Sequence, residues 1–151
     1  MRIQRTVLDT IAAHARRDAP RECCGLLIGT DTEVTEAIPV ANEADDPVRR
    51  YEVPPIAHLA QIRRCRELAK ATGVNVGVVG GYHSHPRSAA EPSPTDREQA
   101  FEDFLYVIAG PVEDALPLDV RAYRLRNGHF EAVELIVDER PEAMSPPATT
   151  R

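Results

Sequence analysis

The centre of the predicted fold is the run Val74-Asn75-Val76-Gly77-Val78-Val79-Gly80-Gly81-Tyr82, which leads directly into His83-Ser84-His85-Pro86. Its valines and glycines predict a central β-strand, with the histidines at the C-terminal end of that strand. Because side chains alternate along an extended chain, His83 and His85 point to one face of the sheet edge and Ser84 points to the other. The two imidazoles can therefore converge on one metal ion.

Beyond this strand, turn and capping signals predict the C-terminal elements. Ser93-Pro94-Thr95-Asp96 opens a short helix, with Ser as the N-cap residue and Pro at the first helical position. An apolar strand follows at Leu105 to Ala109. The strands Leu118 to Arg126 and His129 to Val137 form a hairpin that turns at Asn127-Gly128.

Two further helices are predicted before the central strand. Apolar residues recur at helical spacing from Thr6 to Arg17, and Pro20 prevents that helix from continuing. The second helix begins at Pro54-Pro55 and ends at Gly73.

Strands and a loop separate these two helices. The short apolar run from Cys23 to Gly29 is typical of a strand buried on both faces, and Val34 to Val40 is its expected antiparallel neighbour. The polar, proline-bearing stretch from Ala41 to Pro55 is predicted to be a functional loop, with one short strand around Tyr51-Glu52-Val53.

Length and composition favour one compact, cytoplasmic domain. The chain has 151 residues, 42% of them hydrophobic, and a formal net charge of −6. No apolar run of about 18 residues predicts a membrane span, and the N-terminus lacks the apolar region of a signal peptide. The three cysteines, Cys23, Cys24 and Cys65, suit a reducing compartment. Because the charge balance is acidic, we expect neither nucleic acid nor a membrane as a partner.

Asp96 is the candidate third ligand of the metal ion, because it lies in the first turn of a helix that follows a proline-kinked loop after His85. Zinc in catalytic sites takes three protein ligands of this kind and keeps one position open for water. Water bound there has a pKa lowered towards about 7. The same Ser93 and Asp96 also fit a purely structural capping box, so both interpretations stay open at this point.

The remaining conspicuous residues are interpreted structurally. His14 and His58 lie on predicted helices without partners at metal-ligand spacing, and Cys23 and Cys24 are expected to be buried small hydrophobes. Gly80-Gly81 is expected to allow close backbone approach, room that an extended peptide could use by adding as a strand.

Other His-X-His chemistries fit the sequence less well. Cytidine-type deaminases need His-X-Glu with a later Pro-Cys-X-X-Cys, zincins need His-Glu-X-X-His, and both patterns are absent. A metal-dependent barrel of the amidohydrolase type needs about 250 residues. A cupin-like metal oxygenase stays as an alternative, with Glu91 as the carboxylate ligand and His129 as the distant imidazole.

The spacing of His83, His85, Ser93 and Asp96 matches the His-X-His-X7-Ser-X2-Asp motif of the JAMM (MPN+) metallopeptidases without a mismatch. The upstream run from Arg21 to Gly29 also resembles the glutamate-bearing strand of the short prokaryotic members. Asn42 to Pro54 is similar to the loop and strand that precede their second helix. The resemblance spans about residues 1–138.

The resemblance implies a role for each motif residue. His83, His85 and Asp96 would bind zinc, and Ser93 would donate a hydrogen bond to the tetrahedral oxyanion. Glu22 would take a proton from the zinc-bound water and return it to the leaving amine. Spacing alone does not distinguish Glu22 from the other glutamates of this half of the chain, which are Glu33, Glu36 and Glu52.

The resemblance also implies a fold, a substrate and a partner. We expect an α/β protein, a three-layer α-β-α sandwich around a mixed, largely antiparallel sheet of the MPN/JAMM-like, cytidine-deaminase-like type. Residues 1–138 would form the metallopeptidase domain and residues 139–151 a disordered tail. The implied activity is hydrolysis of a peptide or isopeptide bond after the C-terminal Gly-Gly of a small ubiquitin-like (β-grasp) or sulfur-carrier protein. The alternative within the family is a non-catalytic MPN-type scaffold.

Overall fold

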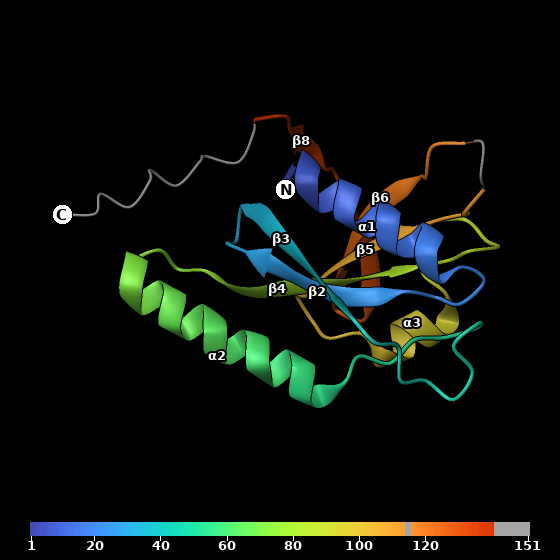
Figure 1. Ribbon diagram of the computed structural model, residues 1–151, viewed down its shortest axis with the longest axis horizontal. Helices are drawn as coiled ribbons and strands as arrows, with labels where there is room; N and C mark the ends of the chain where they lie inside the picture. The colour runs from blue at the N-terminus through green and yellow to red at the C-terminus, as the bar shows by residue number, and fades with distance from the viewer. Residues whose placement is uncertain (114–115, 141–151) are drawn as a thin grey trace.

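The computed structural model describes residues 1–113 and 116–140, and within them eight strands form one sheet in the order β7-β6-β5-β4-β2-β3-β1-β8. The pairs β2–β3, β2–β4, β5–β6 and β6–β7 are antiparallel, and the other three pairs are parallel. The sheet is therefore mixed and largely antiparallel, as expected (Figure 1). The strands are β1 (Arg2–Gln4), β2 (Cys24–Gly29), β3 (Glu33–Val40), β4 (Gly77–Ser84), β5 (Leu105–Ala109), β6 (Val120–Arg126), β7 (His129–Val133) and β8 (Ile136–Asp138).

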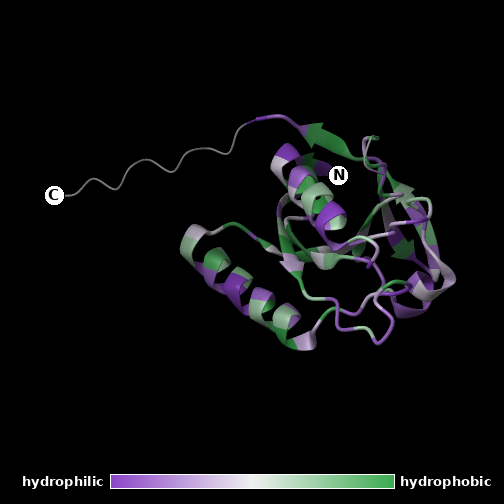
Figure 2. Ribbon diagram, turned by 45° about the vertical axis from the view of Figure 1, so that its right-hand side comes forward, coloured by the Kyte–Doolittle hydropathy of each residue, from purple (hydrophilic) through white to green (hydrophobic). Residues whose placement is uncertain are grey.

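Two long helices cover opposite faces of this sheet, which confirms the three-layer prediction (Figures 1 and 2). α1 (Arg5–Asp18) buries Val7 and Ile11 in the main core, and each such side chain stabilises the fold by about 1.5–3 kcal/mol relative to an exposed one. α2 (Pro55–Thr72) buries only Cys65 and ends at Gly73, which adopts the left-handed conformation that favours glycine. The third helix, α3 (Pro94–Gln99), is short. No helix in residues 1–113 or 116–140 is long and apolar enough to cross a membrane.

β4 lies in the middle of the sheet and is held on both sides. His83 pairs with Cys24 of antiparallel β2 and with Ile108 of parallel β5. A Cβ atom at Gly80 would collide with the carbonyl oxygen of Leu105. The close approach predicted for Gly80 is confirmed, but the neighbouring strand β5 takes up the room, so a peptide could not add as a strand there.

The prediction of one strand from His129 to Val137 is wrong. β7 ends at Val133, and after Glu134 and Leu135 the chain forms β8, which pairs with β1 at the opposite edge of the sheet. The main chain of Met1 fixes this crossing, because its ammonium donates to the Glu134 carbonyl at 3.0 Å and its carbonyl accepts from the Ile136 amide at 3.0 Å. β1 was not predicted at all, because it is only three residues long.

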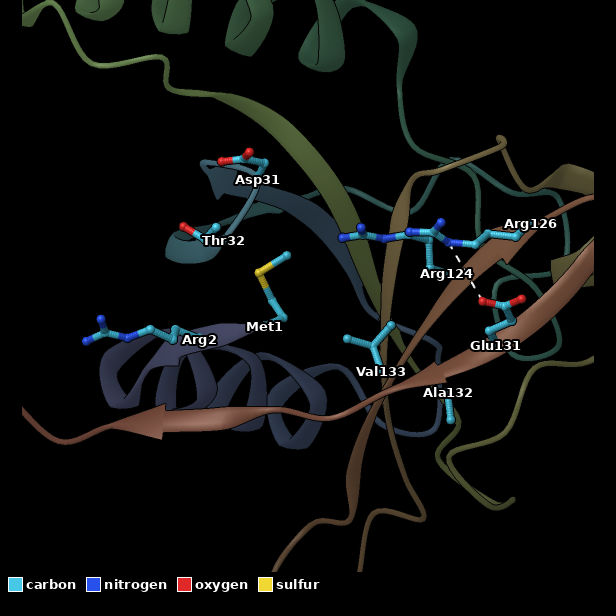
Figure 3. Close-up of a pocket in the computed structure, with 9 residues that line it drawn as sticks. All are labelled: Met1, Arg2, Asp31, Thr32, Arg124, Arg126, Glu131, Ala132 and Val133. Carbon is cyan, nitrogen blue, oxygen red and sulfur yellow. Dashed lines mark ion pairs between the residues drawn. The ribbon is translucent and has the colours of Figure 1, made fainter.

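The two edges of the sheet are thus consecutive in the chain, and the sheet curls until they face each other. The opening between them holds a cavity of about 510 Å³, with Met1 and Thr32 on one side and Arg124 and Val133 on the other (Figure 3). None of the histidines and carboxylates of the predicted metal site lines this cavity.

Two smaller expectations also differ from the structure. Tyr51 to Val53 form no strand, because this segment is held by side-chain hydrogen bonds described below. Residues 141–151 of the predicted tail lie outside the described part of the chain, whereas Glu139 forms an ion pair with Arg5 of α1.

His14 has a structural role, as predicted from its position on α1. It is buried, with Nδ1 at 2.7 Å from the Tyr82 hydroxyl and Nε2 at 3.1 Å from an Asp18 oxygen. Burial lowers the pKa of His14, and Asp18 opposes that effect only in part.

We therefore expect His14 to destabilise the fold in acid. Its pKa is lower in the folded chain than in the unfolded chain, so the free energy of unfolding falls as the pH drops below about 6.5. Urea unfolding at pH 7.5 and 5.5 measures the free energy of unfolding. Between these two pH values that free energy should fall less in His14→Gln than in the wild type, because all other titratable groups are common to both proteins. Equal losses in the two proteins would contradict this role for His14.

Candidate metal centre

The side chains of His83, His85 and Asp96 meet at the end of β4. The Nε2 atoms of His83 and His85 lie 3.1 Å apart. One Asp96 oxygen lies 3.3 Å from His83 Nε2 and the other lies 3.2 Å from His85 Nε2. All three side chains are buried, and among the described residues they form the one group of this kind whose ligand atoms lie within 4.8 Å of one another.

The local sequence explains how Asp96 reaches the histidines. The Ser93 hydroxyl accepts a hydrogen bond from the Asp96 amide at 3.1 Å, and an Asp96 carboxylate oxygen accepts one from the Ser93 amide at 2.8 Å. This is a complete capping box with Pro94 at the first position of α3. The capping and ligand interpretations of Asp96 are therefore compatible, because the cap fixes the carboxylate beside both rings.

The backbone also fixes which nitrogen of His85 faces the centre. His85 Nδ1 lies 2.9 Å from the Ala89 carbonyl oxygen, which can only accept a hydrogen bond. Nδ1 must therefore carry the proton, so the Nε2 lone pair is free to face Asp96 and His83. Metal-binding histidines commonly have this outer hydrogen bond.

Electrostatics favour a cation between these atoms. Burial alone would raise the pKa of Asp96, but the adjacent His83 and His85 rings outweigh burial and lower that pKa. Burial lowers the pKa of His83, which favours its neutral ring. A buried carboxylate and imidazole lone pairs in mutual contact repel one another unless a proton or a metal ion lies between them. The donor set of two imidazoles and one carboxylate fits a catalytic metal ion.

Glu22 lies next to this group, although it stands two residues before Cys24, the first residue of β2. Its Oε1 is 3.7 Å from His85 Nε2, and its Oε2 is buried with no hydrogen-bond partner among the described residues. Burial raises the pKa of Glu22 to about 7, and the nearby His85 opposes that shift. The other three glutamates considered from the sequence, Glu33, Glu36 and Glu52, are not in this group.

Ser93 and Glu22 face a common cleft. A cavity of about 200 Å³ is lined by both residues together with His85, Pro86 and Val48. As the helix cap, Ser93 uses a lone pair of its hydroxyl, which leaves the hydroxyl proton free to be donated into the cleft. The cleft thus brings a proton acceptor, a hydrogen-bond donor and one candidate metal ligand, His85, to one place.

The residues of the cupin-like alternative do not come together. Glu91 is exposed and lies 3.4 Å from the Arg121 guanidinium. His129 is exposed at the start of β7, opposite Arg126 in the hairpin. Neither residue belongs to the His83, His85 and Asp96 group.

One residue beside the centre was missed by the sequence reasoning. The Tyr51 ring stacks on His83, with ring centroids 4.3 Å apart and an interplanar angle of 20°. Tyr51 belongs to the loop between β3 and α2, and nothing in the periodicity of that polar loop indicates which side chain turns inward.

An apolar pocket continues from Tyr51 away from the metal centre. Its volume is about 280 Å³, and aromatic residues dominate the wall that β5 and the segment between α3 and β5 provide. Phe101, at 65% exposure, forms part of the rim. The lining residues include Leu26, Tyr51, Val53, Pro55, His58, Gly81, Phe101, Phe104 and Tyr106.

Comparison with known proteins identifies the class that this fold and centre define. Residues 4–126 match the family model of prokaryotic homologs of the JAB domain, so the chain belongs to that family. It is 39% identical over 110 residues to the desampylase of Haloferax volcanii, covering 68% of this chain and 75% of the relative. It is 33% identical over 135 residues to a probable TtuB-protein conjugate cleaving protease of Thermus thermophilus, covering 89% of this chain and 81% of the relative. It is 30% identical over 128 residues to the CysO-cysteine peptidase of Mycobacterium tuberculosis, covering 83% of each chain.

Solved structures agree on the fold. A protein from Desulfitobacterium hafniense superposes with a TM-score of 0.79 at 25% identity, covering 94% of this chain and 96% of the other. A structure described as a JAMM metalloprotease-like zinc site in the proteasome and signalosome has a TM-score of 0.54 at 26% identity, covering 92% of this chain and 98% of the other. The resemblance to the JAMM family and the expected fold are both confirmed.

Proposed function

We propose that this chain is a zinc-dependent metallopeptidase that cleaves after the C-terminal Gly-Gly of a ubiquitin-like or sulfur-carrier protein. The observation that carries the proposal is the buried convergence of His83, His85 and Asp96 beside Glu22. The names of three relatives support the substrate class, since each is a peptidase or a conjugate-cleaving protein. Residues 1–138 form the catalytic domain in this proposal, and the buried free cysteines suit a cytoplasmic location.

His83, His85 and Asp96 hold the zinc ion in this proposal. When bound, zinc lowers the pKa of a coordinated water towards about 7 and polarises the scissile carbonyl. The chain's own residues then do the rest of the chemistry. The short outer hydrogen bond of His85 and the capping box of Asp96 keep these ligands oriented during turnover.

Glu22 is the group that carries the proton from the attacking water to the leaving amine in this proposal. Its pKa of about 7 in the metal-free chain means that the carboxyl group can both accept and release a proton near neutral pH. Glu22 takes a proton from the attacking water and delivers it to the leaving amine. Ser93 faces the same cleft and donates its hydroxyl proton to the developing oxyanion.

The apolar pocket beside Tyr51 binds the substrate tail upstream of Gly-Gly. The cleft of about 200 Å³ next to His85 suits glycine, and the separate pocket of about 280 Å³ beside Tyr51 suits a larger apolar side chain. Phe104 is one wall of that pocket.

Phe104→Ala should raise KM for a β-grasp substrate about tenfold and leave kcat within about twofold, because the pocket binds ground state and transition state alike. Steady-state kinetics measure both constants. Phe130→Ala is the matched control, since Phe130 packs on the far side of Tyr106 and does not line the pocket. A fall in kcat with unchanged KM in Phe104→Ala would contradict this role.

The proposed function is tested with β-grasp proteins extended beyond Gly-Gly by a short reporter peptide. The zinc-loaded protein is incubated with each fusion, with and without a chelator, and the cut positions are read by mass spectrometry. Cleavage directly after the second glycine, abolished by the chelator, is the expected result. An intact fusion in every zinc-loaded reaction, or a cut that the chelator does not affect, would contradict the proposal.

A further inference from the structure

We propose that Asn42 is a positioning residue of the catalytic centre, which holds the Glu22 backbone and the Tyr51 segment through one side-chain amide. This inference rests on the proposed function, because it treats Glu22 as the proton carrier. No step of the sequence reasoning assigned a role to Asn42.

The backbone of Glu22 needs such an anchor. Glu22 lies outside β2, and its main chain is held by the loop between β3 and α2. The Glu22 amide donates to the Pro47 carbonyl at 2.8 Å, and the Glu22 carbonyl accepts from Asn42 Nδ2 at 3.0 Å. Both polar backbone groups of Glu22 therefore depend on the conformation of that loop.

Asn42 also fixes the backbone on both sides of Tyr51. Its Nδ2 donates to the Arg50 carbonyl at 3.0 Å, and its Oδ1 accepts from the Glu52 amide at 3.0 Å. Oδ1 accepts a further hydrogen bond from the Ala44 amide at 3.0 Å.

The amide of Asn42 is thus fully used. An asparagine side chain offers two N–H donors and two acceptor lone pairs, and all four have partners here. No other side chain of similar size has this combination, because aspartate lacks the donors and leucine lacks both. The requirement is therefore specific for asparagine and is not met by bulk alone.

These contacts connect the two sides of the centre. Through Glu22, Asn42 acts on the carboxylate that lies 3.7 Å from His85 Nε2. Through Arg50 and Glu52, it acts on the Tyr51 ring that stacks on His83. His83 and Asp96 stand on β4 and α3, and His85 directly follows β4, so these candidate ligands should keep their positions when Asn42 is changed. Loss of Asn42 should therefore impair proton transfer and spare metal binding.

The test compares Asn42→Ala with the wild type, using the β-grasp fusion that the wild type cuts fastest. We expect kcat to fall about 10- to 100-fold, because small misplacements of a catalytic group cost rates of this order. Zinc content after purification should equal that of the wild type. The Glu22 amide donates to Pro47 in the loop that Asn42 holds, so its hydrogen exchange should accelerate. This exchange rate reports the loss of anchoring without reference to activity.

Three controls separate positioning from general damage. Asn42→Asp keeps the acceptor oxygen and removes the donors, so Glu22 exchange and kcat should follow Asn42→Ala while the Glu52 amide stays protected. Glu43→Gln changes an exposed neighbour in the same loop and should match the wild type. Val7→Ala weakens the core, so it should lower Tm and leave kcat of the folded protein unchanged.

Failure of the role proposed for Asn42 can be distinguished from failure of the proposed function. A wild type that cleaves, with Asn42→Ala at a kcat within about twofold of it, would overturn the role of Asn42 and leave the proposed function intact. Equal loss of zinc and of activity in Asn42→Ala would also overturn it. If the wild type cleaves no fusion, the proposed function fails, and unchanged Glu22 exchange in Asn42→Ala would still refute the anchoring.

Discussion

Glu22→Gln should turn over substrate about 10²–10⁴-fold more slowly than the wild type while it binds the same amount of zinc. Glutamine has nearly the shape of glutamate but cannot accept the proton that the mechanism assigns to Glu22. Its side chain is also not among the group of candidate metal ligands, which consists of His83, His85 and Asp96. Kinetics and metal analysis on the same preparation measure both properties.

Glu91→Gln is the matched control for this variant. Glu91 lies on the surface beside Arg121, so its substitution should change neither turnover nor metal content. Wild-type turnover in Glu22→Gln would show that another group carries the proton. Metal loss in Glu91→Gln would instead support the cupin-like alternative, in which Glu91 is the carboxylate ligand.

Asp96→Asn should lose both zinc and activity, down to the level of the chelated wild type. Asparagine can still accept the Ser93 amide hydrogen bond and so keep the start of α3, but it removes the negative charge that faces both histidines. His83→Ala should have the same effect by removing a ligand nitrogen. Zinc titration followed by calorimetry measures the loss, and added zinc should raise the Tm of the wild type but not that of these two variants.

Glu98→Gln is the control for Asp96→Asn, because Glu98 is exposed on the same short helix. It should bind zinc as the wild type does. Full zinc affinity in Asp96→Asn would mean that the carboxylate only caps α3, which was the structural alternative for this residue.

Local patterns predicted the elements that carry the candidate metal ligands. The alternation of a strand places His83 and His85 together, and the Ser93-Pro94-Thr95-Asp96 sequence fixes the helix start that brings Asp96 beside them. Both signals act within a few residues, so they can be read from the chain directly. The spacing did not reveal that the cap and the ligand are one arrangement.

Glu22 could be assigned only from family resemblance, and the structure explains why. It lies about sixty residues before His83, and the antiparallel pairing of β2 with β4 brings the two together through the register Cys24↔His83. A register between distant strands depends on the whole sheet and has no local signal. Glu33, Glu36 and Glu52 have equally suitable side chains but lie elsewhere.

The failures of the sequence reasoning have the same non-local origin. The break between β7 and β8 contains only Glu134 and Leu135, with no glycine or proline to mark it, and it exists because β1 offers a free edge. Likewise, Tyr51 turns towards His83 because Asn42 binds the backbone on both sides of it. Composition showed only that this segment is polar.

Anomalous scattering at the zinc absorption edge, from a crystal of the protein grown with ample zinc, shows whether His83, His85 and Asp96 hold the ion. One strong peak is expected, bound by His83 Nε2, His85 Nε2 and an Asp96 oxygen at distances of about 2.0–2.2 Å. Asp96 turned to bulk solvent, or a peak that shares none of these three ligands, would contradict the proposed zinc site.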